Sequence, residues 1–190
     1  MKLEHTALPG VLLLTPIRHE DDRGFFSESW SRKTMEQHGI SHDFVQDNHS
    51  LSDEVGVVRG LHFQAPPYAQ VKLVRCGQGL LFDVVVDIRL GSPTYGKWVG
   101  YELSAENGRQ ILIPEGFAHG FVTREPRTEI IYKCSRYYAP QADGGIRWND
   151  PAIGIDWELD GMMPILSDKD KTAPLLKELD SPFVFDDLTA

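Results

Sequence analysis

Apolar and polar residues alternate over short segments along most of the chain, and glycine or proline residues separate these segments. In residues 80–89 the apolar side chains Phe82, Val84, Val86 and Ile88 recur at every second position, which is the period of a β-strand. Similar signals predict further strands at residues 57–64, 71–76, 98–103, 109–113, 120–123 and 129–138. Because these short strands follow one another without alternating helices, the pattern predicts an all-β antiparallel sandwich or barrel.

Two short helices are expected beside these strands. Residues 31–38 form the first, with Ser31 as its N-cap and Gly39 just beyond its end, because these residue types are favoured at the two ends of a helix. The second lies within residues 167–179, where Thr172 is the expected cap and Pro174 falls in the first turn.

Length and charge restrict the possible functions. A chain of 190 residues is within the usual range for one domain, so we expect residues 1–190 to form a single domain. The net charge of −9 argues against nucleic acid as a partner, because such binding needs a basic surface. It still allows one small anionic ligand, which a few convergent cations can hold. No apolar run approaches the length of a membrane span, so no membrane association is expected.

Two features bear on the cellular compartment. The apolar patch at residues 11–14 is too short for the core of a signal peptide, and no small-residue cleavage site follows it. Cys76 and Cys134 make neither a disulfide framework nor a zinc pattern. We therefore expect a soluble protein of the cytoplasm, where thiols stay reduced.

Candidate chemistry begins with three side chains on neighbouring predicted strands. Arg59 and His62 lie on one strand, and Lys72 begins the next. Strict alternation would place Arg59 and His62 on opposite faces, but Gly60 between them is suited to a bulge that re-aims one side chain. A lone histidine in a strand is more often a structural hydrogen-bonding residue. The nearby Arg59 and Lys72 favour a ligand site instead, because clustered cationic groups are unfavourable unless a ligand uses them.

A second motif lies in residues 111–121 (ILIPEGFAHGF). Its Pro-x-Gly-x-x-His pattern matches the second sequence motif of the cupin jelly rolls. In that motif Pro114 and Gly116 make a tight turn that brings His119 into the mouth of the barrel. The alternative interpretation is a surface turn that carries an incidental histidine. The motif therefore favours a cupin-type β jelly roll.

A metal site is not expected in this barrel. A metal-binding cupin needs a His-x-His pair and a glutamate in its first motif, whereas this chain has His62 followed by Phe63 and Gln64. Lys72 comes next and would repel a cation. Two histidines alone make a poor transition-metal site.

Residues 129–138 contribute a candidate acid. Alternation places Ile130, Tyr132, Cys134, Arg136 and Tyr138 on one face of this strand. A tyrosine in a barrel strand is usually a packing residue whose hydroxyl is satisfied at the edge. It can also act as a general acid where it faces a substrate.

Several segments together resemble the dTDP-4-dehydrorhamnose 3,5-epimerase family, and they occur in the family's order over nearly the whole chain. Without the resemblance, residues 16–28, which contain the first matching segment, would be interpreted as a polar turn, and residues 166–170 as a charged loop. The matching segments are residues 22–28 (DRGFFSE), 44–50 (FVQDNHS), 59–64 (RGLHFQ), 72–74 (KLV), 83–89 (DVVVDIR), 113–121 (IPEGFAHGF), 148–151 (WNDP) and 166–170 (LSDKD).

The resemblance implies a jelly-roll homodimer in which the N-terminal segment of one chain reaches into the partner's site. It implies dTDP-4-dehydro-6-deoxy-D-glucose as substrate, dTDP-4-dehydro-L-rhamnose as product and no cofactor. By resemblance, His62 is the general base and Tyr132 is the acid on the opposite face of the sugar. Lys72 stabilises the enolate. Asp170 orients His62, with Asp83 as a rival for that role.

The resemblance also implies a set of substrate-binding residues, of which residues 23–28 come from the second chain. They are Arg23, Phe26, Glu28, Gln46, Asn48, Arg59, His119, Tyr138, Asp143 and Lys169. This chain departs from the family pattern at three positions: Asp143 stands where glutamate is usual, Leu51 replaces a basic residue and Phe63 replaces a tyrosine. None of these departures touches His62, Lys72 or Tyr132.

Three alternative functions remain at this level. The nearest is an enzyme of the same superfamily that inverts only C3 or C5, or that moves the ketone from C4 to C3. A metal-dependent cupin oxygenase would need the missing His-x-His pair. A non-catalytic binder of sugar nucleotides would have no need for an acid and a base on opposite faces of the sugar.

Overall fold

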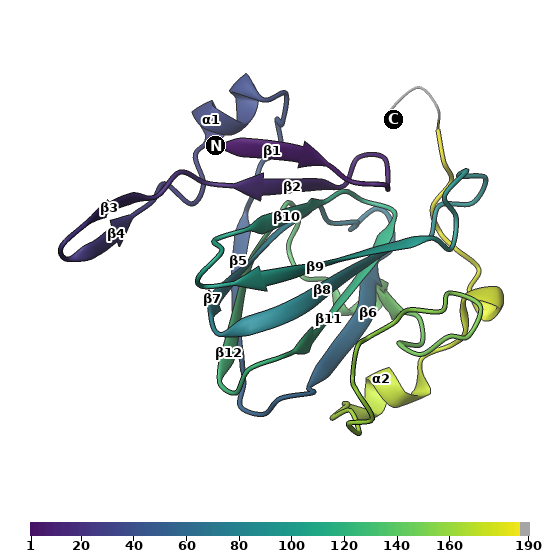
Figure 1. The fold of residues 1–190 in the computed structure, drawn as a ribbon. Coiled ribbons are helices and arrows are strands. Elements are labelled where there is room, and N and C mark those ends of the chain that lie inside the picture. Colours follow the sequence, from purple (N-terminus) through teal and green to yellow (C-terminus); the bar gives the residue numbers. More distant parts are fainter. Residues whose placement is uncertain (187–190) are drawn as a thin grey trace.

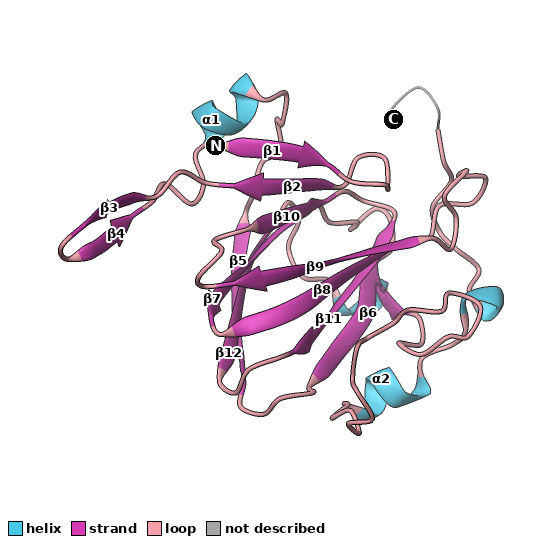
Figure 2. Ribbon diagram, in the orientation of Figure 1, coloured by secondary structure: helices cyan, strands magenta, loops and turns pink. Residues whose placement is uncertain are grey.

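The computed structural model describes residues 1–186 and shows a sandwich of two antiparallel β-sheets (Figures 1 and 2). Its strands are β1 Lys2–His5, β2 Leu12–Thr15, β3 His19–Asp21, β4 Gly24–Phe26, β5 Gln46–Ser52, β6 Val58–Gln64, β7 Lys72–Gln78, β8 Leu80–Asp87, β9 Trp98–Ser104, β10 Gln110–Ile113, β11 Phe117–Thr123, β12 Thr128–Cys134 and β13 Asp143–Gly145. Within the described residues, one sheet has the order β1-β2-β10-β7-β12-β5 and the other β13-β6-β11-β8-β9. This confirms the predicted all-β jelly roll. The hairpin β3–β4 projects away from the sandwich (Figure 1).

The chain changes sheets at a single residue between β7 and β8. Gly79 separates the two strands, yet they belong to different sheets, so this turn is a corner of the sandwich and not a hairpin. Gly79 has φ +77°, and a Cβ at this position would lie 2.6 Å from Thr128 Oγ1. Glycine is therefore required on both counts. Because of this corner, β7 and β8 lie in different sheets. Lys72, at the start of β7, lines the candidate site together with residues of β6 and β11.

Strand β8 is buried on both of its faces. Leu81 and Val85 pack between the two sheets, whereas Val84 and Val86 pack against the C-terminal part of the chain. That part covers the outer face of the second sheet with side chains such as Trp157. The period-two pattern suggests one apolar face, but in a strand covered on both sides the odd positions are buried as well. Asp83 and Asp87 share the inner face with Leu81 and Val85.

Both predicted helices form, but the second begins earlier than its predicted cap. Helix α1, Arg32–Gln37, has Ser31 as its N-cap, and the Ser31 hydroxyl accepts a hydrogen bond from the Thr34 amide. Helix α2, Asp168–Thr172, ends at the residue that was expected to cap it. Its N-cap is Ser167, and the backbone leaves the helical region at the residue before Pro174 because proline disfavours that region there.

The short 3₁₀ helices η1, Pro140–Ala142, and η2, Leu176–Glu178, complete the helical elements of residues 1–186. No helix in this part of the chain is long and apolar enough to cross a membrane.

One strand boundary affects the site. Strand β12 ends at Cys134, so Arg136 and Tyr138 lie beyond the strand and do not continue its alternation. At this point the Ser135 hydroxyl accepts a hydrogen bond from the Val71 amide.

Candidate active site

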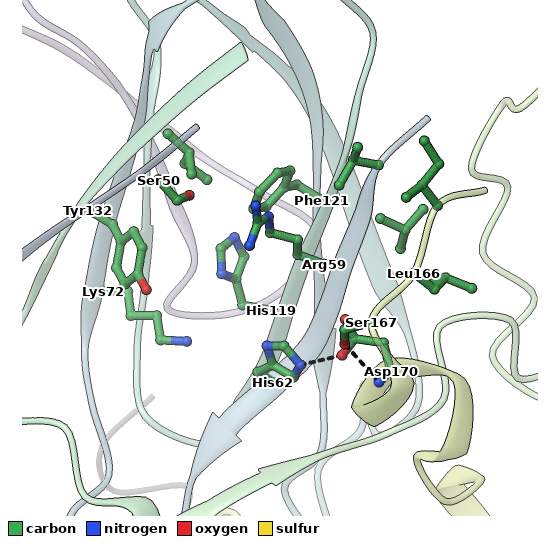
Figure 3. A pocket seen from close by; sticks show the side chains of 14 residues that line it. Ser50, Arg59, His62, Lys72, His119, Phe121, Tyr132, Leu166, Ser167 and Asp170 are labelled. Carbon is green, nitrogen blue, oxygen red and sulfur yellow. Dashed lines mark hydrogen bonds and ion pairs between the residues drawn. The ribbon is translucent and has the colours of Figure 1, made fainter. Parts of the chain in front are cut away.

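The interior of the sandwich opens into a cavity of about 460 Å³ (Figure 3). Strands β6 and β11 form one wall, and β5, β7 and β12 form the opposite wall. The segment that leads into α2 closes one side. The predicted site residues that line this cavity are Arg59, His62, Lys72, His119, Tyr132 and Asp170.

His62 and Asp170 form a hydrogen-bonded pair at one side of the cavity. His62 Nε2 lies 2.6 Å from Asp170 Oδ1, and Asp170 is only 3% exposed. Ser167, the N-cap of α2, donates its hydroxyl proton to Asp170 Oδ2 over 2.8 Å. Because Asp170 occupies Nε2, the other ring nitrogen, Nδ1, is the one left for a ligand. Figure 3 shows the His62 ring between Asp170 and the Lys72 side chain.

The surroundings of Asp170 keep its carboxyl group ionised. Burial works to raise the pKa of Asp170, but hydrogen bonds from His62 and Ser167 act in the opposite direction and hold the pKa below its usual value. An ionised Asp170 accepts a hydrogen bond from the Nε2–H group of His62. This favours the form of the ring in which Nδ1 carries no proton. The arrangement therefore makes Nδ1 of His62 suitable as a general base.

Lys72 brings a cation into the cavity from the opposite sheet. It begins β7 and is partly buried, and its ammonium group points toward His62 (Figure 3). Within residues 1–186, no hydrogen bond or ion pair holds this ammonium group. Burial lowers the pKa of Lys72, and the nearby Asp83 carboxylate opposes that shift. The ammonium is thus free to bind an anionic group of a ligand.

Tyr132 faces the cavity from β12, on the sheet opposite to His62 (Figure 3). Burial raises the pKa of its phenol. The hydroxyl therefore keeps its proton at neutral pH and is suited to donate it. Its neighbour across the strand pair is Asn48 on β5.

A bulge in β6 turns Arg59 and His62 toward the same cavity. His62 is opposite His119 and Arg59 is opposite Phe121, so a three-residue step on β6 faces a two-residue step on β11. Gly60 has φ +120°, and a Cβ there would lie 2.6 Å from the β11 backbone. The predicted bulge at Gly60 is therefore confirmed. The Arg59 guanidinium also donates to Ser52 Oγ over 3.2 Å.

A second His–Asp pair lies deeper in the cavity wall. His119 Nε2 lies 2.8 Å from Asp83 Oδ2, and Asp83 is fully buried. Asp83 therefore pairs with His119, whereas the partner of His62 is Asp170. Burial raises the pKa of Asp83, and the neighbouring His119 and Lys72 act against this rise.

Five of the predicted binding residues lie beside the cavity. Gln46 and Asn48 project from β5 next to Tyr132, and the Gln46 amide donates to Asn48 Oδ1 over 2.9 Å. Behind His62 a second cavity of about 390 Å³ contains Asp143 and Lys169, which form an ion pair. The Tyr138 hydroxyl donates to Asp143 Oδ2 over 3.4 Å.

Three predicted binding residues lie on or just after the β3–β4 hairpin, outside the main cavity. Arg23 pairs with Asp21 inside the hairpin, and Phe26 is 72% exposed. Glu28 accepts a hydrogen bond from the Thr34 hydroxyl over 2.8 Å. The single chain therefore does not bring these three residues together with His62.

The cavity is also lined by residues that the sequence did not assign to the site: Ser50, Val57, Val58, Phe121, Ile130, Ile165, Leu166 and Ser167. A sequence signal existed for Ser50, because it alternates with Gln46 and Asn48 on the inner face of β5. No comparable signal marks Ile165, whereas Leu166 begins the matching segment 166–170 (LSDKD). Among residues 1–186, no group of three or more His, Cys, Asp or Glu side chains is arranged to hold a metal ion.

Comparison with known proteins agrees with this geometry. A family profile described as dTDP-4-dehydrorhamnose 3,5-epimerase matches residues 5–178. A dTDP-4-dehydrorhamnose 3,5-epimerase of Salmonella typhimurium is 56% identical over 174 residues, which are 91% of this chain and 94% of that protein.

Two solved structures are similar over nearly their whole length. A dTDP-6-deoxy-D-glucose-3,5-epimerase from Legionella pneumophila, in complex with dTDP-4-keto-L-rhamnose, has a TM-score of 0.93 at 45% identity and covers 97% of this chain and 98% of its own. A dTDP-4-dehydrorhamnose 3,5-epimerase from Bacillus anthracis, with TDP and PPi bound, has a TM-score of 0.88 at 50% identity and covers 92% and 98%. Together with the family profile, these matches show that the chain belongs to the dTDP-4-dehydrorhamnose 3,5-epimerase family.

Proposed function

We propose that this protein converts dTDP-4-dehydro-6-deoxy-D-glucose into dTDP-4-dehydro-L-rhamnose by inverting C3 and C5. The observation that carries this proposal is the arrangement of one cavity with the His62–Asp170 pair on one side, Tyr132 on the opposite sheet and Lys72 between them. The family membership and the ligand named for the Legionella pneumophila enzyme support the choice of sugar nucleotide. Each inversion removes one proton and returns one proton, so it consumes no oxidant or reductant.

His62 begins each inversion by removing a proton. C3 and C5 are the two carbons next to the C4 ketone, so loss of a proton from either carbon gives an enolate with its charge on the C4 oxygen. Nδ1 of His62 takes this proton, and Asp170 stabilises the imidazolium that forms. A positioned general base of this kind contributes about 10²–10⁴-fold to the rate.

Lys72 stabilises the enolate. Its ammonium group enters the cavity without a hydrogen-bond partner in the described chain, so it is available to the developing negative charge on the C4 oxygen. One well-placed donor is commonly worth about 3–4 kcal/mol of transition-state stabilisation.

Tyr132 completes the inversion by returning a proton to the opposite face of the carbon. Burial raises the pKa of its hydroxyl, so the proton is present before the reaction starts. Its position on the sheet opposite to His62 supports protonation from the other side of the sugar ring. The single-centre alternative uses the same residues and differs in how many carbons reach them.

The nucleotide part of the substrate is bound by the polar groups around the cavity. Arg59 and His119 contact the sugar or the phosphates, since a guanidinium pairs well with phosphate oxygens. Gln46, Asn48, Tyr138, Asp143 and Lys169 extend this surface beside the catalytic residues. These five are proposed contacts of the nucleotide and the outer part of the sugar.

The functional unit is proposed to be a homodimer that exchanges the hairpin β3–β4. The hairpin projects from the sandwich, and its side chains Phe25 and Phe26 are 57% and 72% exposed (Figure 1). Exposed aromatic side chains on a protruding element favour a partner surface. In a dimer, Arg23 and Phe26 of one chain would join the cavity of the other, with Glu28 beside them.

Mixing two inactive variants tests this exchange. We expect His62→Ala and Arg23→Ala to be inactive as separate dimers, because each lacks one part of every site. After subunits exchange, each mixed dimer contains one site with both His62 and Arg23, so activity should recover to about a quarter of the wild-type value if mixing is random. A monomer by sedimentation, or a mixture that stays inactive after subunit exchange is verified, would contradict hairpin exchange.

The working compartment is proposed to be the cytoplasm. Both cysteines, Cys76 and Cys134, are free and buried. Unpaired cysteines are typical of proteins from a reducing compartment.

Proton NMR of the substrate in D₂O tests the proposed reaction. We expect deuterium at both C3 and C5, and a product that a 4-keto reductase converts to dTDP-L-rhamnose. His62→Ala should abolish exchange at both carbons, whereas Tyr132→Phe should impair net inversion more than exchange. Tyr137→Phe is a matched control, because Tyr137 is 70% exposed and lies outside the cavity.

Other results of this measurement distinguish the alternatives. Exchange at one carbon would indicate a single-centre epimerase, and a 3-keto product would indicate a ketoisomerase. Wild-type activity in His62→Ala or Tyr132→Phe would overturn the assigned roles. Binding of the substrate without exchange would support a non-catalytic function.

A further inference from the structure

Asp83 is a buried acid behind the cavity wall, and the proposed reaction gives it no role. It lies on β8, is 0% exposed, and has His119 as the hydrogen-bond partner of Oδ2. Its other oxygen, Oδ1, is buried and has no hydrogen-bond partner among residues 1–186. A buried carboxylate with one unpaired oxygen is unfavourable for folding, so the position calls for a functional explanation.

Two groups that face the cavity are coupled to this carboxylate, one by a hydrogen bond and one by charge. His119 on β11 is hydrogen-bonded to it, and Lys72, at the start of β7 on the opposite sheet, points its ammonium group into the cavity that His119 also lines. Burial lowers the pKa of Lys72 and raises the pKa of Asp83. The attraction between their charged forms opposes both shifts. Asp83 therefore links the two cavity groups electrostatically.

We propose that Asp83 is a positioning residue for the epimerisation, which holds His119 with Nδ1 free and keeps the Lys72 ammonium charged. The inference rests on the proposed function, because it assigns Asp83 a part in that reaction. An ionised Asp83 accepts the Nε2 proton of His119, so Nδ1 becomes the nitrogen available to a ligand. The same negative charge favours the protonated form of Lys72, which is the form that stabilises an enolate.

Other charged or titratable groups near Lys72 do not replace Asp83. Besides the cavity residues His62, His119, Tyr132 and Asp170, they are Cys134 on β12, Asp143 on β13 and Lys169 on α2. Burial raises the pKa of the Cys134 thiol, so this thiol is neutral at neutral pH. Asp143 already forms an ion pair with Lys169. The positive charge of Lys169 repels that of Lys72 and acts to lower the pKa of Lys72. This leaves Asp83 as the main anion that supports the Lys72 ammonium.

The isosteric substitution Asp83→Asn tests the inference through the pH profile of kcat. Without the carboxylate, burial still lowers the pKa of Lys72 while the opposing attraction is lost. The alkaline limb of the profile should therefore move to lower pH. At mildly alkaline pH we expect kcat to fall by about 10²-fold, the typical effect of losing one electrostatic donor. KM should change much less.

Asp87→Asn is the matched control. Asp87 is the other fully buried acid of β8, but its carboxylate is bound by Arg89, Ser92 and Thr94 and lies outside the cavity. This variant should lose thermal stability without moving the alkaline limb. If Asp83→Asn keeps the wild-type alkaline limb, or if both variants shift it equally, the inference is wrong.

NMR of the unliganded protein decides the question independently of substrate. With ¹³C-labelled lysine, Lys72 should titrate at lower pH in Asp83→Asn than in the wild type. With ¹⁵N-labelled histidine, the wild-type His119 ring should carry its proton on Nε2. A proton on Nδ1 alone would overturn the inference. This measurement uses only the wild-type protein, so it remains decisive even if the variant fails to fold. Absence of deuterium exchange in the wild type would refute the proposed function and leave these two results unaffected.

Discussion

Two His–Asp pairs reach the same cavity, and their carboxylates have opposite environments. Asp170 accepts hydrogen bonds from His62 at 2.6 Å and Ser167 at 2.8 Å, and together they lower its pKa against the effect of burial. Asp83 has His119 as a donor at 2.8 Å and leaves Oδ1 unpaired, so burial dominates and raises its pKa. Asp83 is the more deeply buried of the two acids and has fewer donors, and both differences separate its pKa from that of Asp170.

This difference suits two different tasks. A carboxylate behind a general base has to stay ionised through every turnover, and the donors around Asp170 provide for that. A carboxylate that balances Lys72 needs its negative charge only while that ammonium group is also charged. The mutual attraction of the two groups is then sufficient to favour both charged forms. In the proposed reaction, the same pair of residue types thus supports proton transfer at one position and charge balance at the other.

Asp170→Asn is expected to produce the largest change. The Ser167 hydroxyl favours an amide oxygen at the Oδ2 position, which turns the amide NH₂ toward His62 Nε2. The ring proton then moves to Nδ1, and His62 can no longer act as a base there. We expect kcat to fall by about 10²–10⁴-fold at neutral pH, measured by deuterium exchange at C3 and C5.

Asp168→Asn is the control for this prediction. Asp168 also lies in the first turn of α2, but its side chain is 98% exposed and pairs with Lys171. Its replacement should leave kcat unchanged. Full activity of Asp170→Asn would show that His62 needs no carboxylate, and it would remove the contrast between the two pairs.

The two acids should also affect stability with opposite signs. The pKa of Asp170 is lowered by folding, so its contribution is present above the unfolded-state pKa and is lost as pH falls through the folded-state pKa. The pKa of Asp83 is raised, so its contribution is present at low pH and is lost as pH rises through the folded-state pKa. At pH 7, Asp170→Asn should therefore lower Tm by several degrees, whereas Asp83→Asn should leave Tm unchanged or raise it.

Thermal melts monitored by circular dichroism between pH 4 and pH 8 check this prediction. The difference in Tm between the two variants should narrow toward pH 4, where Asp170 approaches protonation in the unfolded chain. A loss of activity in Asp83→Asn without loss of stability would fit a residue kept for function. If both variants lowered Tm equally at every pH, the contrast in ionisation would be refuted.

The local pattern predicted much of the fold and the cluster of Arg59, His62 and Lys72 in one site. Alternation and turn residues located strands β6 to β12 but not β1 to β5 or β13. Gly60, between Arg59 and His62, predicted the bulge that turns both side chains into one cavity. The partner of His119 was not predictable in the same way. It depends on β8 lying next to β11, which places Asp83 across from Phe121, and such long-range pairing leaves no local signal.

Two other features depend on more than the local pattern. The start of α2 was misplaced because Thr172 and Pro174 resemble a helix start, whereas Ser167 provides the actual cap through its bond to the Asp170 amide. The hairpin residues Arg23 and Phe26 lie away from the cavity of their own chain. Any role in binding therefore requires a second chain, which the geometry of one chain does not contain.

Ser167→Ala should have the smallest effect, and it tests the cause of the contrast directly. The substitution removes the N-cap of α2 and one of the hydrogen-bond donors to Asp170. The pKa of Asp170 should therefore rise, as burial raises the pKa of Asp83. The acidic limb of the kcat profile should then move to higher pH, and stability should fall by about 1 kcal/mol through loss of the cap.

Two variants separate the donor effect from damage to the helix. Thr172→Ala removes a hydroxyl from the other end of α2, where it bonds Asp168 O, and should leave the acidic limb in place. Ser167→Thr keeps both the cap and the donor, so it should retain the wild-type profile. If Ser167→Ala also keeps that profile, the hydroxyl does not control the ionisation of Asp170, and His62 and the Gly60 backbone amide must account for the lowered pKa.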